Sequence, residues 1–122
     1  MNIDVNKIYA VLTGDIIRSS RLSPDQREHV MQVLTSLAHS STVFSPDLQV
    51  LGPQVFRGDS WQMLISEPQF ALHVALYLRA GLKSQPQVDT RIAIGLGTIE
   101  ALPNNDLGNA NGTAFRLSGN AL

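Results

Sequence analysis

The chain has 122 residues, of which 43% are hydrophobic and 16% are charged. This is enough for one domain with a buried core and is unlike a disordered tail. The net charge of −1 argues against a general binder of nucleic acids or membrane surfaces. The absence of cysteine excludes disulfides, cysteine-ligated zinc and thiol catalysis. Because the sequence shows no signal-peptide pattern and no apolar run of membrane-spanning length, we expect a cytoplasmic protein with no membrane partner.

The first part of the chain predicts a strand followed by a helix. Lys7 to Gly14 is a short apolar run with little alternation, which is typical of a strand buried on both faces. A loop follows from Asp15 to Leu22. Ser23-Pro24-Asp25-Gln26 then combines a capping serine, a proline in the first turn and a capping-box glutamine, and it predicts a helix to about His39.

The middle of the chain predicts a hairpin. Leu48 to Phe56 is an extended segment broken by Gly52-Pro53, which favours an edge strand or a bulge. Gly58-Asp59 has the composition of a tight turn, and Ser60 to Ile65 is the returning strand. Ser66-Glu67-Pro68-Gln69 repeats the helix-start pattern, so we expect a second helix from there to about Lys83.

The last part predicts one more strand and the start of a helix. Thr90 to Ile99 is the strand, and a segment rich in Gly and Asn follows from Pro103 to Gly112. Thr113 to Leu122 begins a helix, and we expect this helix to be completed by a further segment. The whole chain, residues 1–122, is interpreted as a single domain.

The predicted order βαββαβ, with right-handed crossovers, gives a ferredoxin-like α/β (α+β) sandwich. Its antiparallel sheet has the order 4-1-3-2, and both helices lie on one face. In this topology the end of the first strand and the turn of the hairpin meet at the same edge of the sheet. Asp15 and Asp59 therefore become neighbours, although they are far apart in the sequence.

Two neighbouring carboxylates share a proton or hold a cation. Mg²⁺ is commonly held by a few carboxylates together with phosphate oxygens, and Mn²⁺ is the alternative cation. The loop that begins at Gly14 offers backbone N–H groups and the hydroxyls of Ser19 and Ser20, which suit phosphate. Arg18 and Arg57 would pair with phosphate oxygens. These residues point to a nucleoside triphosphate held through a metal ion.

A purely structural interpretation stays open for each part of this pattern. Gly14-Asp15 would then be a strand-ending turn, and Gly58-Asp59 would be an ordinary hairpin tip. The arginines would be solvated surface groups.

Four segments carry a resemblance to the SatD family: Tyr9 to Ser20, Arg57 to Gln62, Arg91 to Gly97, and Gly108 to Gly119. More distantly, the pattern is similar to class III nucleotide cyclases and, more loosely, to diguanylate cyclases. The cyclase resemblance implies that Asp15 and Asp59 bind metal ions and that Arg116 is a catalytic, transition-state arginine. It also implies a homodimer, because class III active sites form between two protomers.

The sequence departs from the cyclase pattern at two places. Cyclases carry an asparagine four residues before the catalytic arginine, whereas this chain has Gly112 there and its Asn111 is displaced by one position. Arg18-Ser19-Ser20 also replaces the Gly-Phe-Thr type of sequence after the first aspartate.

These features lead to three hypotheses about function. The leading one is a metal-dependent nucleotide-binding regulatory module. The second is an active nucleotidyl cyclase or a related phosphoryl-transfer enzyme, in which the metals activate a ribose hydroxyl and Arg116 neutralises developing charge. The third is a dimerisation or interaction domain of a longer regulatory protein.

Overall fold

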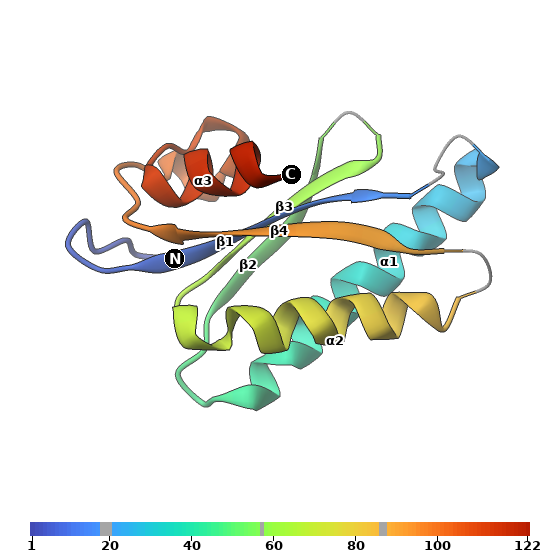
Figure 1. Cartoon of the computed structure of the whole chain (residues 1–122), viewed down its shortest axis with the longest axis horizontal. Helices are drawn as coiled ribbons and strands as arrows, with labels where there is room; N and C mark the ends of the chain where they lie inside the picture. Colours follow the sequence, from blue (N-terminus) through green and yellow to red (C-terminus); the bar gives the residue numbers. More distant parts are fainter. Residues whose placement is uncertain (18–20, 57, 86–87) are drawn as a thin grey trace.

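The chain folds into a four-stranded antiparallel sheet that carries helices on both faces (Figure 1). The computed structural model describes residues 1–17, 21–56, 58–85 and 88–122. The strands are β1 (Tyr9–Ile16), β2 (Val50–Phe56), β3 (Ser60–Ile65) and β4 (Thr90–Gly97). They lie side by side in the order β2-β3-β1-β4, which confirms both the predicted sheet and the α/β class.

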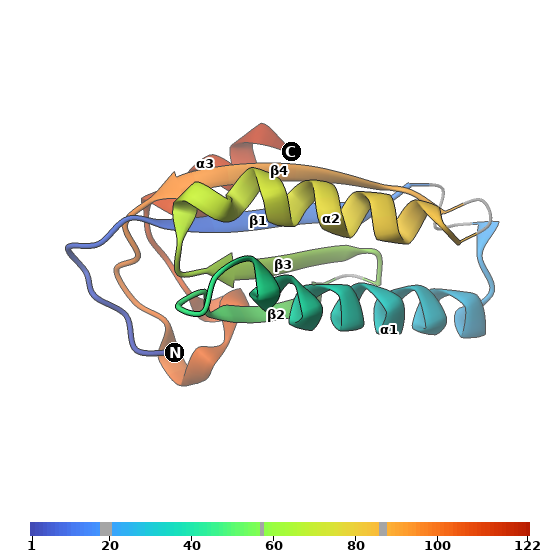
Figure 2. The same cartoon turned by 90° about the horizontal axis from the view of Figure 1, so that it is seen from below.

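The described residues form three α-helices, which divide between the two faces of the sheet (Figures 1 and 2). α1 (Pro24–Ser40) and α2 (Ala71–Lys83) pack together on one face, as predicted, and α3 (Thr113–Ala121) lies on the other. Short 3₁₀ turns lie at Ser41–Phe44, Pro68–Phe70, Pro103–Asn105 and Leu107–Asn109. No helix in the described parts of the chain has the length and apolar character that crossing a bilayer requires.

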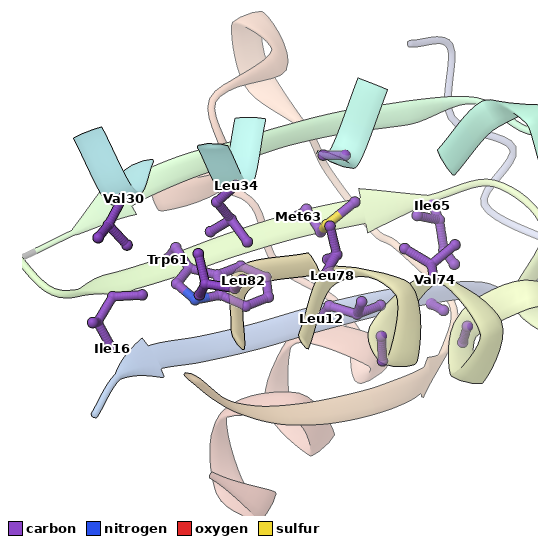
Figure 3. Close-up of a cluster of buried hydrophobic side chains, with 14 of the residues drawn as sticks. Leu12, Ile16, Val30, Leu34, Trp61, Met63, Ile65, Val74, Leu78 and Leu82 are labelled. Atoms are coloured by element: carbon purple, nitrogen blue, oxygen red, sulfur yellow. The ribbon is translucent and has the colours of Figure 1, made fainter. Parts of the chain in front are cut away.

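Two hydrophobic clusters hold these layers together, because successive strand residues point to opposite faces. The larger cluster fills the space between the sheet and the pair α1 and α2 (Figure 3); its largest fully buried members include Leu12, Leu34, Trp61, Met63, Ile65, Leu78 and Leu82. The smaller cluster lies under α3 and contains Tyr9, Val11, Leu64, Ile99, Leu107, Ala114 and Phe115.

The start of α1 agrees with its sequence signal. The Gln26 amide donates to the Ser23 Oγ at 3.2 Å, and the Ser23 amide donates to the Gln26 Oε1 at 2.7 Å. This is the reciprocal capping box that the sequence predicts. α1 continues to Ser40, one residue beyond the predicted end.

The predicted start of the second helix at Ser66 is wrong. A 3₁₀ turn at Pro68–Phe70 comes first, and α2 begins at Ala71 without a side-chain cap. Ser66 is buried, and its Oγ accepts a hydrogen bond from the Gln49 amide at 2.8 Å. The hydroxyl therefore satisfies a backbone donor of the segment entering β2 rather than a helix terminus.

The ends of two strands differ from those expected. β1 continues to Ile16, so Asp15 lies inside the strand rather than at the start of a loop, and β4 ends at Gly97. The segment from Pro103 to Gly112 forms two 3₁₀ turns and a bridge between Ala101 and Asn111. Gly52-Pro53 lies at a register shift in the edge strand β2, as its composition predicts.

Candidate functional site

A groove of about 520 Å³ lies on the face of the sheet that α3 covers. Thr13 of β1 and Ser60, Trp61 and Gln62 of β3 line its floor, which is polar because the indole of Trp61 is buried in the larger cluster on the other face. Its walls come from β2, the 3₁₀ turn Leu107–Asn109 and α3, and they include Phe56, Leu107, Gly108, Ala110, Phe115 and Gly119. Apolar walls around a few polar groups are typical of small-molecule sites.

The floor of the groove is tied to α3 by hydroxyl groups. The Ser118 Oγ donates to the Thr13 Oγ1 at 2.5 Å, and the Gln62 Nε2 donates to the same oxygen at 3.4 Å. Thr13 therefore joins β1, β3 and α3 at one point. This arrangement fixes how far the α3 wall stands from the floor.

α3 approaches the sheet closely because β4 has a glycine beneath it. A Cβ added at Gly95 would collide with the carbonyl oxygen of Ala114 and the amide nitrogen of Ser118. Both are backbone atoms of α3, so any side chain at this position would push the helix away. The glycine in the strand thus sets the height of the groove wall.

The opposite wall is held by one side chain of the edge strand. Gln54 donates from its Nε2 to the carbonyl oxygen of Asn105 at 2.8 Å and accepts from the amide of Leu107 at 2.9 Å. Asp106 accepts from the amide of Gly108 at 3.0 Å and so closes the turn itself. The Gly/Asn-rich segment is therefore anchored to β2, and this turn lines the groove.

Asp15 lies one position beyond the groove floor on the same face, because it follows Thr13 by two residues in β1. Its carboxylate is held by Arg91 of the neighbouring strand β4. The Arg91 Nε donates to Oδ1 at 3.0 Å, and the Nη2 donates to Oδ2 at 2.7 Å. Both carboxylate oxygens therefore carry a charge-assisted hydrogen bond from one guanidinium group.

The main chain of Asp59, just before β3, lies beside the end of β1 that carries Asp15, as the topology predicts. Asp15 pairs with Ser60, and the Ile16 amide donates to the carbonyl oxygen of Asp59 at 2.9 Å. Asp59 is half-buried and lines a small crevice beside α1 together with Leu22. The two acids thus lie at the same end of the sheet, but Asp15 is on the groove face and Asp59 is on the opposite face, beside α1.

The main chain at Asp15 is fixed from the opposite face of the sheet. The buried Trp61 Nε1 donates to the Thr90 Oγ1 at 3.1 Å, and that hydroxyl donates to the carbonyl oxygen of Asp15 at 2.6 Å. Gly14 makes room for this arrangement, since a Cβ there would collide with the indole ring of Trp61. The glycine before the acid therefore has a packing role.

Arg116 lies on α3, where its guanidinium donates to the Thr113 Oγ1 at 3.2 Å. The residue is exposed, and its neighbour Phe115 lines the groove. The remaining sequence-predicted phosphate-binding residues, Arg18, Ser19, Ser20 and Arg57, lie outside the described residues.

Among the described residues, this end of the sheet carries two arginine–aspartate pairs. The hydrogen bonds and charge of Asp15 raise the pKa of Arg91 above its ordinary value. Asp89 is paired in the same manner with Arg79, whose hydrogen bond is the main reason that the pKa of Asp89 is lowered. Lys83 lies 3.6 Å from the same carboxylate and acts in the same direction.

The described residues at this end of the sheet supply few donors for a metal ion. Among the residues that the structure describes, no three His, Asp or Glu side chains converge, so these residues do not form a complete protein cage. Mg²⁺ usually needs only one or two carboxylates, because phosphate oxygens and water complete its shell. Asp15 alone supplies a carboxylate to the groove face, which meets only the lower end of that requirement, because Asp59 lies beside α1.

Sequence reasoning missed several residues that shape this site. Arg91 was not assigned a role, although the predicted pairing of the first and last strands places it near Asp15. Thr13 shares a face with Asp15 by strand alternation, which is a signal in the sequence. The contact between Thr13 and Ser118 spans 105 positions, and nothing local indicates it.

The comparisons with known proteins support the fold. No family model matches the sequence, and a search of curated proteins finds no match. Among solved structures, the chain is similar to an adenylate/guanylate cyclase/hydrolase from Silicibacter pomeroyi, with 20% identity and a TM-score of 0.63. The match covers 94% of this chain and 68% of that one. The chain therefore has a nucleotide-cyclase-like fold.

Proposed function

We propose that this domain binds a nucleoside triphosphate together with a divalent cation and acts as a regulatory module. The observation that carries this proposal is the position of Asp15 near the end of β1, on the groove face and just beyond the polar floor. The apolar walls of the groove suit a base and a sugar. The hydroxyl and amide groups of its floor can form hydrogen bonds to them. A carboxylate at one end suits a metal-bound phosphate chain.

In this proposal Asp15 holds Mg²⁺ or Mn²⁺ on the groove face, and the Asp59 side chain turns from its position beside α1 to hold the ion jointly with phosphate oxygens. The cation neutralises the charge of the phosphate chain. Gly14, Arg18, Ser19, Ser20 and Arg57 bind the phosphates, as the sequence predicts. Membership of the SatD family and a homodimer in the manner of class III cyclases belong to the same proposal.

An active nucleotidyl cyclase or related phosphoryl-transfer enzyme is the second candidate. It is favoured by α3, on which Arg116 directly follows the groove-lining Phe115. In that case Arg116 would neutralise charge that develops on the phosphates. Gly112, which stands where cyclases have an asparagine, favours binding without turnover.

Calorimetric titration with ATP and GTP, with and without Mn²⁺, tests the proposal. We expect binding that depends on Mn²⁺ and is lost in Asp15→Asn and in Asp59→Asn. Asp89→Asn is the matched control, because Asp89 also pairs with an arginine at this end of the sheet but does not line the groove. This variant should bind as the wild type does.

The same samples separate the candidate functions. A cyclic product or released phosphate that disappears in Arg116→Ala would favour the enzyme. No heat with either nucleotide, from a folded protein, would overturn the nucleotide site. An interaction domain would tolerate both aspartate changes and fail instead when exposed apolar residues are altered.

A further inference from the structure

We infer that Arg91 is a competing cation at Asp15, and that it makes metal binding and phosphate binding depend on each other. The inference rests on the proposed metal at Asp15 and goes beyond it, because it assigns a role to a residue outside the predicted site. Arg91 holds both carboxylate oxygens of Asp15, at 2.7 and 3.0 Å. A metal ion that bonds to Asp15 therefore has to displace this guanidinium or share the carboxylate with it.

The geometry favours a contact that can open. The Arg91 side chain is 66% exposed, whereas that of Asp15 is 19% exposed. An exposed arginine is easily released into water, since surface ion pairs are weak. The main chains of both residues are held alike by the β1–β4 ladder and by the Thr90 hydroxyl, so the exposure of the two side chains is what distinguishes them. The arginine is thus the mobile partner and the carboxylate is the fixed one.

Release of Arg91 has opposite consequences for a metal alone and for a metal with phosphate. A bare divalent cation places two like charges beside Asp15 and leaves the guanidinium without an anionic partner. A phosphate chain that arrives with the metal offers such a partner, because guanidinium binds phosphate oxygens in the same forked manner. Arg91 therefore opposes the metal alone and supports the metal–phosphate pair, which is a positive coupling between two ligands.

The test measures Mn²⁺ binding and nucleotide binding separately in the wild type and in Arg91→Ala. Mn²⁺ binding without nucleotide is followed by the electron paramagnetic resonance signal of the free ion. Binding of a non-hydrolysable ATP analogue is followed by calorimetry, in EDTA and at saturating Mn²⁺. We expect Arg91→Ala to bind Mn²⁺ alone about tenfold more tightly. Its gain in nucleotide affinity on adding Mn²⁺ should be about tenfold smaller than in the wild type.

Arg79→Ala is the matched control, because Arg79 makes the same bidentate contact to Asp89, at 3.0 and 3.1 Å. It should leave both measurements as in the wild type. Arg91→Lys keeps the charge but loses the planar fork, so it should lie between the wild type and Arg91→Ala. Folding of each variant is checked by circular dichroism.

The outcomes separate this inference from the proposed function. Equal or undetectable Mn²⁺ binding in the wild type and Arg91→Ala would overturn the inference, as would an equal gain in Arg79→Ala. If Arg91→Ala gains Mn²⁺ affinity while no variant binds nucleotide, the competition at Asp15 holds and the nucleotide site is lost.

Discussion

Replacement of Gly95 by alanine is expected to weaken the fold and open the groove together. The added Cβ would overlap two backbone atoms of α3, at Ala114 and Ser118. Backbone atoms cannot rotate away as a flexible side chain does, so α3 has to shift as a unit. This shift also stretches the hydrogen bond from Ser118 to Thr13.

The magnitude follows from those two effects. Overpacking of a core costs about 1–3 kcal/mol, and loss of one hydrogen bond costs about 1 kcal/mol. We therefore expect Gly95→Ala to lower the free energy of unfolding by about 2–4 kcal/mol, out of a total of about 5–15 kcal/mol for a typical domain. Urea denaturation measures this change, and hydrogen exchange should show the loss concentrated in α3.

Gly119→Ala is the matched control within α3 itself. Among the described residues, no atom lies within 4 Å of a Cβ added at Gly119. Alanine is the better helix former, so this variant should gain roughly 0.5–1 kcal/mol. If Gly95→Ala is as stable as the wild type, close backbone packing does not hold α3 against β4. Equal changes in the two variants would contradict the reasoning as well.

Two further predictions concern stability away from the groove. Ser23→Ala should cost about 1 kcal/mol of unfolding free energy, because it removes the cap of the Gln26 amide; urea denaturation measures it, and a loss below a few tenths would contradict the capping role. Arg79 and Lys83 hold the pKa of Asp89 below its ordinary value of 3.8, so this ion pair stabilises the fold fully above about pH 5 and loses its effect as the pH falls through the lowered pKa. The stability difference between the wild type and Asp89→Asn should therefore shrink between about pH 5 and pH 2 in thermal melts, and a difference that grows over this range would refute the assignment.

Local signals in the sequence predicted most of the fold. The tetrapeptide at Ser23 predicted the start of α1, because its capping box is closed by residues within one turn. The same pattern at Ser66 failed, because the amide of Gln49, far along the chain, takes the serine hydroxyl instead. A local pattern is thus decisive only when no distant partner competes for the same atoms.

The candidate site was predictable only where it depends on strand order and not on register or long-range contacts. Topology alone predicted that the main chains of Asp15 and Asp59 lie at the same end of the sheet, but it did not predict that Asp59 lies on the α1 side. The contact between Asp15 and Arg91 additionally required the register of β1 against β4, which the strand pattern does not specify. The groove walls were beyond prediction, because Gln54 builds one of them by binding a segment with no hydrophobic period.

The packing of Trp61 beneath Gly14 gives the protein an internal optical probe. It is the only tryptophan of the chain, and its indole nitrogen is linked through Thr90 to the carbonyl of Asp15. Because the ring is fully buried on the far face of the sheet, a ligand on the groove face cannot quench its emission by touching it. A change in tryptophan fluorescence on adding Mg²⁺, which is neither paramagnetic nor coloured, would therefore report a change in the packing of β3 against β1, without any label.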